Sequence, residues 1–297
     1  MEQLKYREHL NQKFKSYKGN SLIYEKFISK GNVTTIIYNS RKVCVEYINQ
    51  NIVSIFIAGI CDEKSNTNST VLKSEDITLT IHNIEDEIVI SGDKIITCIN
   101  KIDSRVTFKD ISGKILCEDF EPSFKDEDGC VYISKIDDYY AYYGFGEKGG
   151  DLNKKGYYIE NFNTDDPETD DESLVYYKTI PFYVALNDQK TYGIFFDNSF
   201  RSFFDMGKSY EDRIFFGAIG GHIQYNFILG KNIKEVICEY ANLTGKMDMP
   251  PLWSLGYQQN RFSYMNSKEI LNVVNTFKDK EIPIDVIYFD IDYMDGF

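Results

Sequence analysis

Short β segments follow one another almost without interruption from about residue 20 to about residue 240 of this 297-residue chain. They are rich in Ile, Val, Thr and aromatic residues, several alternate apolar with polar positions, and turn residues separate them. Clear examples are KVCVEYI, IVSIFIAGI, EIVISG, KIITCIN, TIPFYVALND and HIQYNFILG. A short helix is expected only in KEVICEYANLTG. Many short strands without crossover helices predict a mainly β fold, a sandwich or a barrel.

The character of the sequence changes at MPPLWSLG, residues 249–256. The Pro-Pro pair is a stiff connector that no helix can cross. After it, LWSLGYQ predicts an apolar strand, and the later run VIYF, which follows Pro283, predicts a second, buried strand. We therefore divide the chain into a β-rich domain, residues 1–245, and the start of another domain, residues 246–297.

The segment between these two strands predicts a helix with its own start signal. Asn266 can cap it, and Glu269 stands where a capping box requires an acid. Its apolar face consists of Ile270, Val273, Val274 and Phe277. Strand, helix and strand form a parallel crossover, the repeating unit of an α/β barrel or a doubly wound sheet. Because one such unit cannot stand alone, we expect the second domain to be incomplete.

Charge and composition exclude several classes of partner. The net charge of −13 argues against nucleic acid and anionic membranes, since both select basic patches. The N-terminal residues are polar, and no run approaches the ~18 apolar residues of a membrane span. Six scattered cysteines fit reduced thiols, and three distant histidines give no metal-ligand spacing. We expect a cytoplasmic protein without cofactor or metal; its oligomeric state stays open, a homo-oligomer included.

Two motifs resemble ligand-binding loops but lack the necessary context. Gly144, Gly146 and Gly149 in GFGEKGG spell G-x-G-x-x-G, yet no amphipathic helix follows, as a dinucleotide site requires. We interpret these glycines as a tight turn within the β domain. The acidic runs KDEDG and NTDDPETDDE lack the spacing and closing Glu of calcium loops. They are expected to be solvated loops, although one acid of the second run remains a candidate for function.

Three acids, Asp290, Asp292 and Asp295, crowd the end of the apolar run VIYF, where the chain stops. Acids just past the C-terminal end of a buried strand are where α/β enzymes keep their chemistry. Alternatively, an acid here caps a following helix, a role that suits Asp295 better than Asp290.

Several motifs together resemble the α-glucosidases of glycoside hydrolase family 31. They are FGEKGGDLNKKGYY, NTDD, YGIFFDNSFRSFFDMG, MPPLWSLGYQQNRFSY and IPIDVIYFDIDYMDGF, in this order over about residues 140–297. The first 140 or so residues match only in being β-rich. The resemblance implies a galactose-mutarotase-like β-sandwich followed by a (β/α)8 barrel, truncated here after its first βαβ unit. The DIDYM motif has the α-glucosidase form, because α-xylosidases carry a bulky aromatic in place of the second Asp.

The resemblance also implies an activity and a set of binding residues. Family members release terminal α-linked glucose from oligosaccharides with retention of the anomeric configuration. They use an Asp nucleophile and an Asp acid/base. Both aspartates would lie beyond residue 297, so no catalytic residue is expected here and the chain alone is predicted to be inactive. The substrate-binding residues carried over by motif are Asp165, Phe262, Asp290 and Ile291.

Each of these residues has an expected role. Asp290 resembles the acid that binds a hydroxyl of the terminal glucose, and Ile291 lines the same pocket. Phe262 matches an aromatic against the sugar, and Asp165 matches an acid on a loop of the N-terminal domain that reaches over the site. Arg261 is expected to support the site without contacting the sugar. Carboxylates accept hydroxyl hydrogen bonds, and an aromatic face packs on C–H edges.

Two other functions stay open on the sequence alone. A non-catalytic carbohydrate-binding β-sandwich module would have no use for the half-built barrel after Pro250. A mutarotase-like epimerase would need a His and a Glu facing each other in the cleft of the sandwich. None of the histidines lies in a motif that indicates such a pair.

Overall fold

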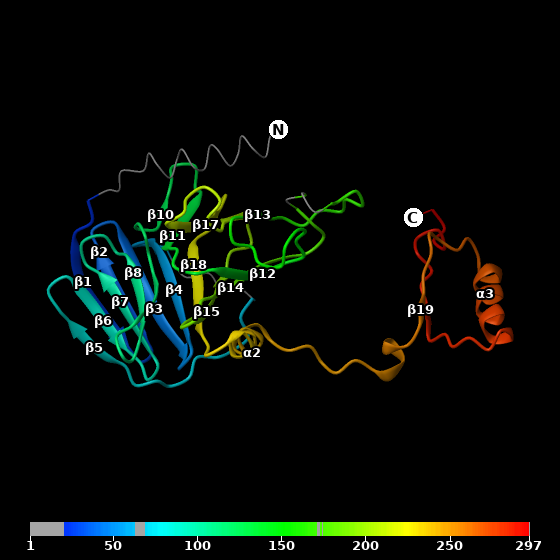
Figure 1. Cartoon of the computed structure of the whole chain (residues 1–297), viewed down its shortest axis with the longest axis horizontal. Coiled ribbons are helices and arrows are strands. Elements are labelled where there is room, and N and C mark those ends of the chain that lie inside the picture. Colours follow the sequence, from blue (N-terminus) through cyan, green and yellow to red (C-terminus); the bar gives the residue numbers. More distant parts are fainter. Residues whose placement is uncertain (1–20, 63–68, 171–172, 174, 297) are drawn as a thin grey trace. The chain divides into compact units, whose positions relative to one another are not determined.

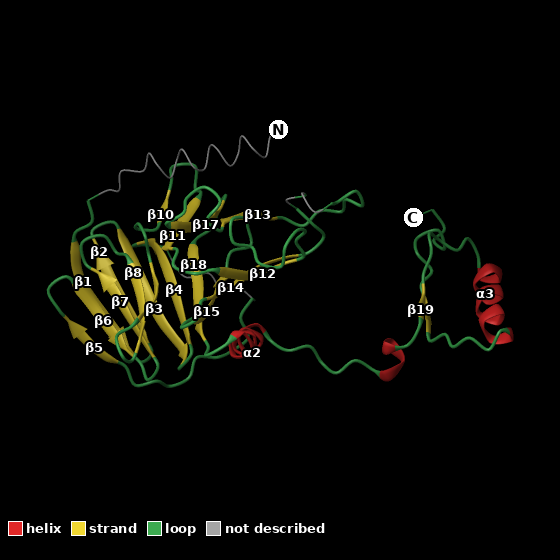
Figure 2. Ribbon diagram, in the orientation of Figure 1, coloured by secondary structure: helices red, strands yellow, loops and turns green. Residues whose placement is uncertain are grey.

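The computed structural model describes residues 21–62, 69–170, 173 and 175–296. The chain divides between Gly245 and Lys246 into two compact units (Figure 1). The described part of the first unit consists mainly of strands, and that of the second combines a helix with short strands (Figure 2). A mainly β chain was predicted, and this prediction is confirmed.

The described residues of the first unit form three antiparallel sheets. The eight-stranded sheet has the order β1 (Tyr24–Lys30), β2 (Val33–Tyr38), β3 (Arg41–Asn49), β4 (Ile52–Gly59), β18 (Ile223–Leu229), β15 (Thr191–Phe196), β14 (Thr179–Leu186) and β12 (Ala141–Gly146). A five-stranded sheet has the order β10 (Phe124–Lys125), β11 (Val131–Ile136), β17 (Arg213–Ala218), β16 (Ser202–Asp205) and β13 (Tyr158–Asn161). The other contains β5 (Thr80–Asn83), β6 (Glu87–Ser91), β7 (Ile95–Asn100), β8 (Val106–Asp110) and β9 (Ile115–Glu118).

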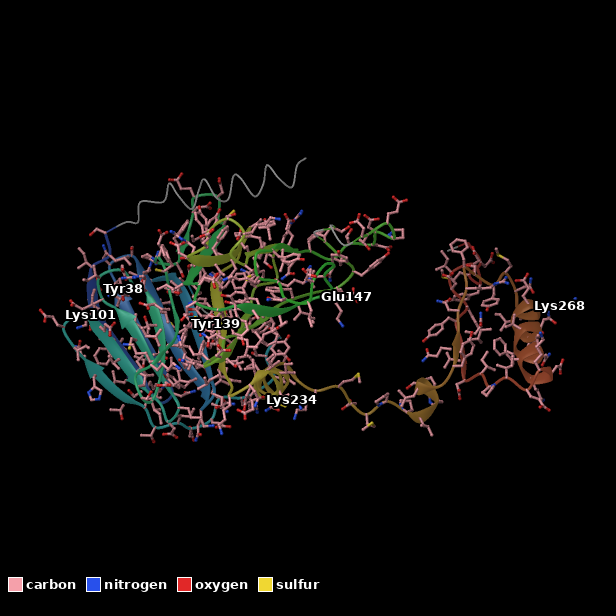
Figure 3. The ribbon with its side chains drawn as sticks, in the orientation of Figure 1. Tyr38, Lys101, Tyr139, Glu147, Lys234 and Lys268 are labelled. Atoms are coloured by element: carbon pink, nitrogen blue, oxygen red, sulfur yellow. The ribbon has the colours of Figure 1, made fainter. Side chains whose placement is uncertain are left out.

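One buried apolar cluster joins these sheets into a sandwich. Phe108 of β8 stacks on Phe227 of β18 with the ring centroids 4.1 Å apart. Tyr38, labelled with Tyr139 in Figure 3, crosses the core from β2 and donates its hydroxyl hydrogen to the carbonyl of Asn100 at 2.5 Å. Side chains from opposite layers therefore fill a common interior, as the sequence predicted for a sandwich.

The alternating sequence of β2 shows how this core is encoded. In VTTIIY the side chains of Thr34, Ile36 and Tyr38 are buried, whereas the residues between them are half-buried. Because successive side chains of a strand point to opposite faces, this pattern places every second residue in the core. The same alternation recurs in β6.

The glycines of GFGEKGG do not form the predicted tight turn. Gly144 and Gly146 lie within β12, where the pairing with β14 shifts at a β-bulge. Their φ angles are +130° and +79°, and a Cβ on Gly144 would lie 2.4 Å from the carbonyl oxygen of Phe182. The residues are glycine because the bulge needs left-handed backbone and brings two strands close together.

The helix predicted in KEVICEYANLTG is present as α2 (Ile233–Thr244). The side chain of Asn232 caps it by accepting a hydrogen bond from the N–H of Glu235 at 3.1 Å. Val236 and Leu243 are buried against the outer face of the large sheet. Tyr240 stacks on Phe182 of β14 with ring centroids 4.0 Å apart, which fixes the helix on the sheet.

The second unit contains the predicted strand, helix and strand. Its described elements are a 3-10 helix (Leu252–Leu255), β19 (Gln258–Gln259), α3 (Ser267–Asp279) and β20 (Val286–Ile287), with β19 and β20 parallel. The predicted capping is confirmed, because Asn266 accepts from the N–H of Glu269 at 3.1 Å. Phe277 on the apolar face of α3 contacts Tyr257 at 5.5 Å between ring centroids.

The two strands of this unit are much shorter than the sequence predicted. LWSLGYQ is mostly a 3-10 helix, and only Gln258–Gln259 pairs as a strand. In VIYF, Val286 and Ile287 are half-buried, but Tyr288 and Phe289 are 49% and 44% exposed. The prediction of a buried strand is therefore wrong for this unit, because one helix and a two-stranded sheet offer too little surface to bury four consecutive apolar side chains.

Candidate functional site

The second unit has a shallow pocket of about 870 Å³ where two segments meet. One segment, residues 260–262, follows β19, and the other, residues 287–290, contains the end of β20. Tyr293 closes one side. Because β19 and β20 are parallel, both segments leave the sheet at its C-terminal edge, where ligands of barrel-type sheets bind.

Asp290 has an unusual backbone conformation and one fixed carboxylate oxygen. Its φ is +65°, a left-handed conformation that Asp and Asn adopt more readily than most residues. Its Oδ2 accepts a hydrogen bond from the backbone N–H of Ser263 at 2.9 Å. Among the described residues, Oδ1 has no hydrogen-bond partner. One oxygen is thus held by the loop after β19, and the other can accept from a ligand.

Arg261 holds the loop that supplies this N–H. Its Nε donates to the carbonyl oxygen of Ser263 at 2.9 Å, and its guanidinium lies 4.6 Å from the ring centroid of the buried Tyr264. A longer ion pair of 3.6 Å joins it to Glu269 on α3. This geometry is that of a support residue: Arg261 fixes Ser263, and Ser263 fixes Asp290.

The other expected site residues are distributed unevenly. Phe262 lines the pocket with Asp290, and its side chain is 91% exposed, so its ring is open to a ligand. Ile291 follows Asp290 and is 51% exposed, but it is not among the lining residues. Asp290 itself is exposed. The structure therefore brings Phe262 and Asp290 together in one pocket.

Asp165 belongs to the first unit. It is exposed on the connection between β13 and β14. Desolvation and the charge of Asp165 raise the pKa of the neighbouring Tyr177 phenol. A carboxylate in this place can accept hydrogen bonds from a hydroxyl group, as the NTDD motif implies.

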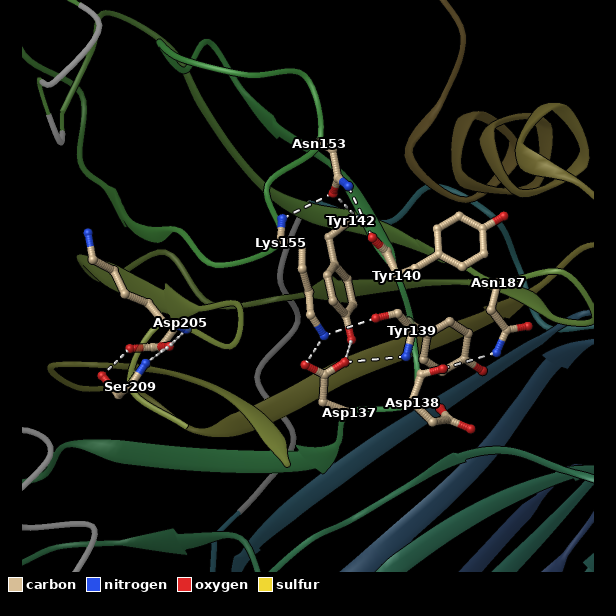
Figure 4. A network of polar contacts seen from close by, with 11 residues as sticks. Asp137, Asp138, Tyr139, Tyr140, Tyr142, Asn153, Lys155, Asn187, Asp205 and Ser209 are labelled. Atoms are coloured by element: carbon tan, nitrogen blue, oxygen red, sulfur yellow. Dashed lines mark hydrogen bonds and ion pairs between the residues drawn. The ribbon is translucent and has the colours of Figure 1, made fainter. Parts of the chain in front are cut away.

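A polar network that the sequence did not reveal fixes the segment after β12 (Figure 4). The carboxylate of Asp137 accepts from the hydroxyl of Tyr142 at 2.8 Å and forms an ion pair with Lys155. The side-chain oxygen of Asn153 accepts from the backbone N–H groups of Tyr142 and Lys155, each at 3.0 Å. Burial, reinforced by the charge of Asp137, raises the pKa of Tyr142 well above its usual value. The segment is therefore rigidly attached to the sandwich.

The sandwich has a pocket of its own, of about 960 Å³, next to β4 and β10. His222 and Glu127 both line it, the residue types that an epimerase would need. His222 packs on Phe56 with ring centroids 5.5 Å apart. No hydrogen bond or ion pair joins His222 to Glu127 among the described residues, so the geometry gives no support to an acid–base pair there.

The described residues contain neither a metal-binding cluster nor a helix that could cross a membrane. No group of three or more His, Cys, Asp or Glu side chains there could hold a metal ion. No helix in the same part of the chain is long and apolar enough to cross a membrane.

Both units match known protein families. Residues 42–205 match the family described as glycosyl hydrolase 31 N-terminal galactose mutarotase-like domain. The chain belongs to glycosyl hydrolase family 31. Residues 247–297 match the family 31 TIM-barrel domain, so the chain corresponds to the N-terminal region of a family 31 glycosidase, with a mutarotase-like sandwich and the start of a barrel domain.

Individual relatives within family 31 differ in specificity. Alpha-glucosidase 2 of Bacillus thermoamyloliquefaciens is 33% identical over 263 residues, which cover 86% of this chain and 33% of that protein. Alpha-xylosidase XylQ of Lactiplantibacillus pentosus is 35% identical over 157 residues, 52% of this chain and 20% of XylQ. This chain therefore spans a third or less of the length of these relatives.

Among solved structures, the family 31 dextranase of Flavobacterium johnsoniae complexed with glucose is similar. It superimposes with a TM-score of 0.83 at 28% identity, covering 94% of this chain and 35% of the dextranase. The glucosidase II alpha subunit superimposes with a TM-score of 0.82 at 17% identity, which shows the common fold.

Proposed function

We propose that this chain is the N-terminal part of a retaining α-glucosidase that releases terminal α-linked glucose from oligosaccharides. The observation that carries the proposal is the pocket in which Phe262 and the carboxylate of Asp290 stand together. Asp290 is held through Oδ2 by the N–H of Ser263, and its Oδ1 can accept from a sugar hydroxyl. The exposed ring of Phe262 offers an apolar face to the C–H side of a sugar.

The chain's own residues bind and orient the substrate in this proposal, and none is assigned a catalytic role. A retaining glycosidase needs a nucleophile and an acid/base on opposite faces of the scissile bond. By the family resemblance both come from later parts of the barrel domain. Asp290, Phe262, Ile291 and, from the first unit, Asp165 would hold the terminal glucose. Because binding energy realised in the transition state lowers the barrier, such contacts contribute to rate as well as affinity.

Glucose is preferred over xylose as the terminal sugar for two reasons. The relative that shares the largest part of this chain among those described above is an α-glucosidase, 33% identical over 86% of the chain. Asp292 stands in DIDYM where, by the resemblance, α-xylosidases carry a bulky aromatic. A small side chain there leaves room for the hydroxymethyl group that distinguishes glucose from xylose.

The proposal is tested by kinetics on a protein that contains this chain and a complete barrel domain. We expect turnover of a nitrophenyl α-glucoside, much slower turnover of the α-xyloside, and initial release of the α-anomer of glucose by NMR. A preference for the α-xyloside, or no turnover of either, would contradict the proposal. The 297-residue chain alone is the control, because both proposed catalytic aspartates are absent from it. If it binds oligosaccharide and the longer protein is inert, the carbohydrate-binding module is the better description.

A further inference from the structure

The connection between β13 and β14 carries Asp165 and is closed at its base by the chain itself. Asn163 and Tyr176 form an isolated β-bridge between the two stems of this connection, residues 160–164 and 176–179. The N–H of Thr164 donates to the carbonyl of Tyr176 at 3.0 Å. The hydroxyl of Thr179 donates to the side-chain oxygen of Asn163 at 2.8 Å. Since Asp165 follows Thr164 directly and is itself exposed, its position depends on how firmly these stems are held.

Lys148 contacts both stems with one ammonium group. Its Nζ donates to the carbonyl oxygen of Glu160 at 2.7 Å, in the outgoing stem. The same Nζ lies 5.7 Å from the ring centroid of Tyr176, in the returning stem. The backbone beside it is fixed as well, because the N–H of Glu147 donates to the carbonyl of Lys178 at 3.0 Å. Lys148 therefore stands between the stems as a cation that both of them contact.

The outgoing stem is anchored on its other side by Arg201. The carboxylate of Glu160 is 1% exposed, and its Oε2 accepts from Nε of Arg201 at 3.0 Å within a two-point ion pair. The same guanidinium lies 5.2 Å from the ring centroid of Phe162. Oε1 of Glu160 has no hydrogen-bond partner among the described residues. A buried carboxylate in this state is stable only where positive charge surrounds it, and Arg201 and Lys148 supply that charge.

We propose that Lys148 is a positioning residue for Asp165: by joining the carbonyl of Glu160 to the ring of Tyr176, it fixes the stems and hence the place where the Asp165 carboxylate stands. The proposal rests on the proposed function, in which Asp165 contacts the sugar. It assigns Lys148 no contact with the substrate.

The surroundings of Lys148 change its protonation equilibrium. Burial lowers its pKa to about 8, and the neighbouring Lys154 acts in the same direction, whereas the charges of Glu160 and Glu147 oppose the shift. Tyr176 presents only its ring face to the ammonium. Above pH 8 the neutral amine keeps a donor for the Glu160 carbonyl but loses its attraction to the ring. Because the fold disfavours the charged form, loss of the ring contact above pH 8 is opposed by relief from this desolvation, so the contact is tested by substitution at constant pH.

Amide hydrogen exchange of the 297-residue chain tests the contact without any need for activity. In Lys148→Met the N–H of Thr164 should exchange about tenfold faster or more, since its bond to Tyr176 opens more often. Lys148→Arg should retain slow exchange, because arginine can donate to the same carbonyl and lie on the same ring. Lys178→Met is the matched control: Lys178 is exposed on the same connection, and its side chain has no polar contact among the described residues. Equal Thr164 exchange in Lys148→Met and Lys178→Met would overturn the proposal.

Kinetics of a protein with a complete barrel then test the consequence for Asp165. Lys148→Met should raise KM for an α-glucoside by about tenfold with a smaller effect on kcat, because a contact that positions substrate is loosened. Lys148→Arg should keep KM close to that of the parent, because arginine can donate to the same carbonyl and lie on the same ring. If the parent hydrolyses no α-glucoside, the proposed function fails while Thr164 exchange still decides the role of Lys148. If exchange accelerates but KM is unchanged, Lys148 holds the stems without positioning a substrate contact, and the proposal is wrong.

Discussion

The ammonium of Lys135 and the carboxylate of Asp119 form an ion pair of 2.5 Å inside the sandwich, and neither side chain has any exposed surface. Lys135 lies in β11, and its Nζ also donates to the hydroxyl of Tyr225 in β18 at 3.0 Å. Asp119 accepts through Oδ2 from the N–H of Val106 in β8 at 2.8 Å. One pair of charges is thus hydrogen-bonded to strands of the three sheets described in the first unit.

Removing either partner of this pair should be costly. Burial raises the pKa of the Asp119 carboxyl, and the charge of Lys135 opposes this shift. Burial also disfavours the Lys135 ammonium, but Asp119 and Tyr225 hold its pKa well above the usual value. We expect Lys135→Met to lower the free energy of unfolding by about 3–5 kcal/mol, because it leaves a buried carboxylate unpaired. The double change Lys135→Met with Asp119→Leu should cost clearly less than the sum of the single changes. Urea denaturation of the three variants measures this; additive losses would show that the two charges do not act as a pair.

The β-bulge in β12 gives a second prediction. Gly144→Ala should lower the free energy of unfolding by about 2–4 kcal/mol, because the new Cβ would meet the carbonyl of Phe182 and the backbone is left-handed. Gly113→Ala is a matched control: its φ is +86°, but nothing lies within 4 Å of an added Cβ. It should cost only the backbone strain, about 1–2 kcal/mol. If the free energy of unfolding falls by a similar amount in both variants, the close approach of β12 and β14 does not contribute to the cost of Gly144→Ala.

The lowered pKa of Lys148 makes a third prediction, about stability and pH. Its folded-state pKa of about 8 lies below the value of 10.5 expected for an unfolded lysine. Between these values the unfolded chain binds more protons, so this group makes the fold more stable as pH rises from 8 to 10.5. Relative to Lys148→Met, the parent should gain on the order of 1 kcal/mol between pH 7 and pH 9.5, a figure reduced for its partial exposure.

Chemical denaturation of both proteins at the two pH values checks this, with Lys178→Met to correct for the loss of a surface charge. A difference between parent and Lys148→Met that does not change with pH would show that the ammonium is not desolvated in the fold. If the parent instead loses stability relative to Lys148→Met between pH 7 and pH 9.5, the predicted direction of the pH effect is wrong.

What the sequence could predict was local. The capping interactions of Asn232 and Asn266 span three residues, and the alternation in β2 spans six, so both can be seen in a short stretch of chain. The bulge at Gly144 and Gly146 was mistaken for a turn, because the glycine pattern signals left-handed backbone without saying whether the chain reverses or continues as a strand.

The polar interior and the site could not be predicted in the same way. Lys135 is 16 residues from Asp119 and 90 residues from Tyr225, and no pattern in the sequence relates them. Asp290 was identified from its motif, but its partner Ser263 stands 27 residues earlier and contributes a backbone N–H, which any residue but proline could supply. The extent of β19 and β20 depends on neighbouring strands, which a local pattern of apolar residues does not contain.

The last prediction concerns Asp290 in a protein with a complete barrel domain. Asn is the appropriate replacement, because it tolerates the left-handed φ of +65° and its side-chain oxygen can still accept from the N–H of Ser263. The loop should therefore keep its shape, and the unfolding temperature should stay near that of the parent. What is lost is the negative charge and the second acceptor oxygen, which we propose binds a glucose hydroxyl.

A hydrogen bond to a charged group contributes about 1.5–3 kcal/mol, so Asp290→Asn should lower kcat/KM for an α-glucoside by about 10²-fold. Asp292→Asn and Asp295→Asn should cost less, because we assign neither residue a direct contact with the sugar. If Asp290→Asn is close to the parent and Asp292→Asn is inactive, the sugar-binding acid of DID has been assigned to the wrong residue. If kcat/KM is unchanged in all three variants while the parent is active, the sugar binds elsewhere. The pocket shared by Phe262 and Asp290 would then not stabilise the transition state.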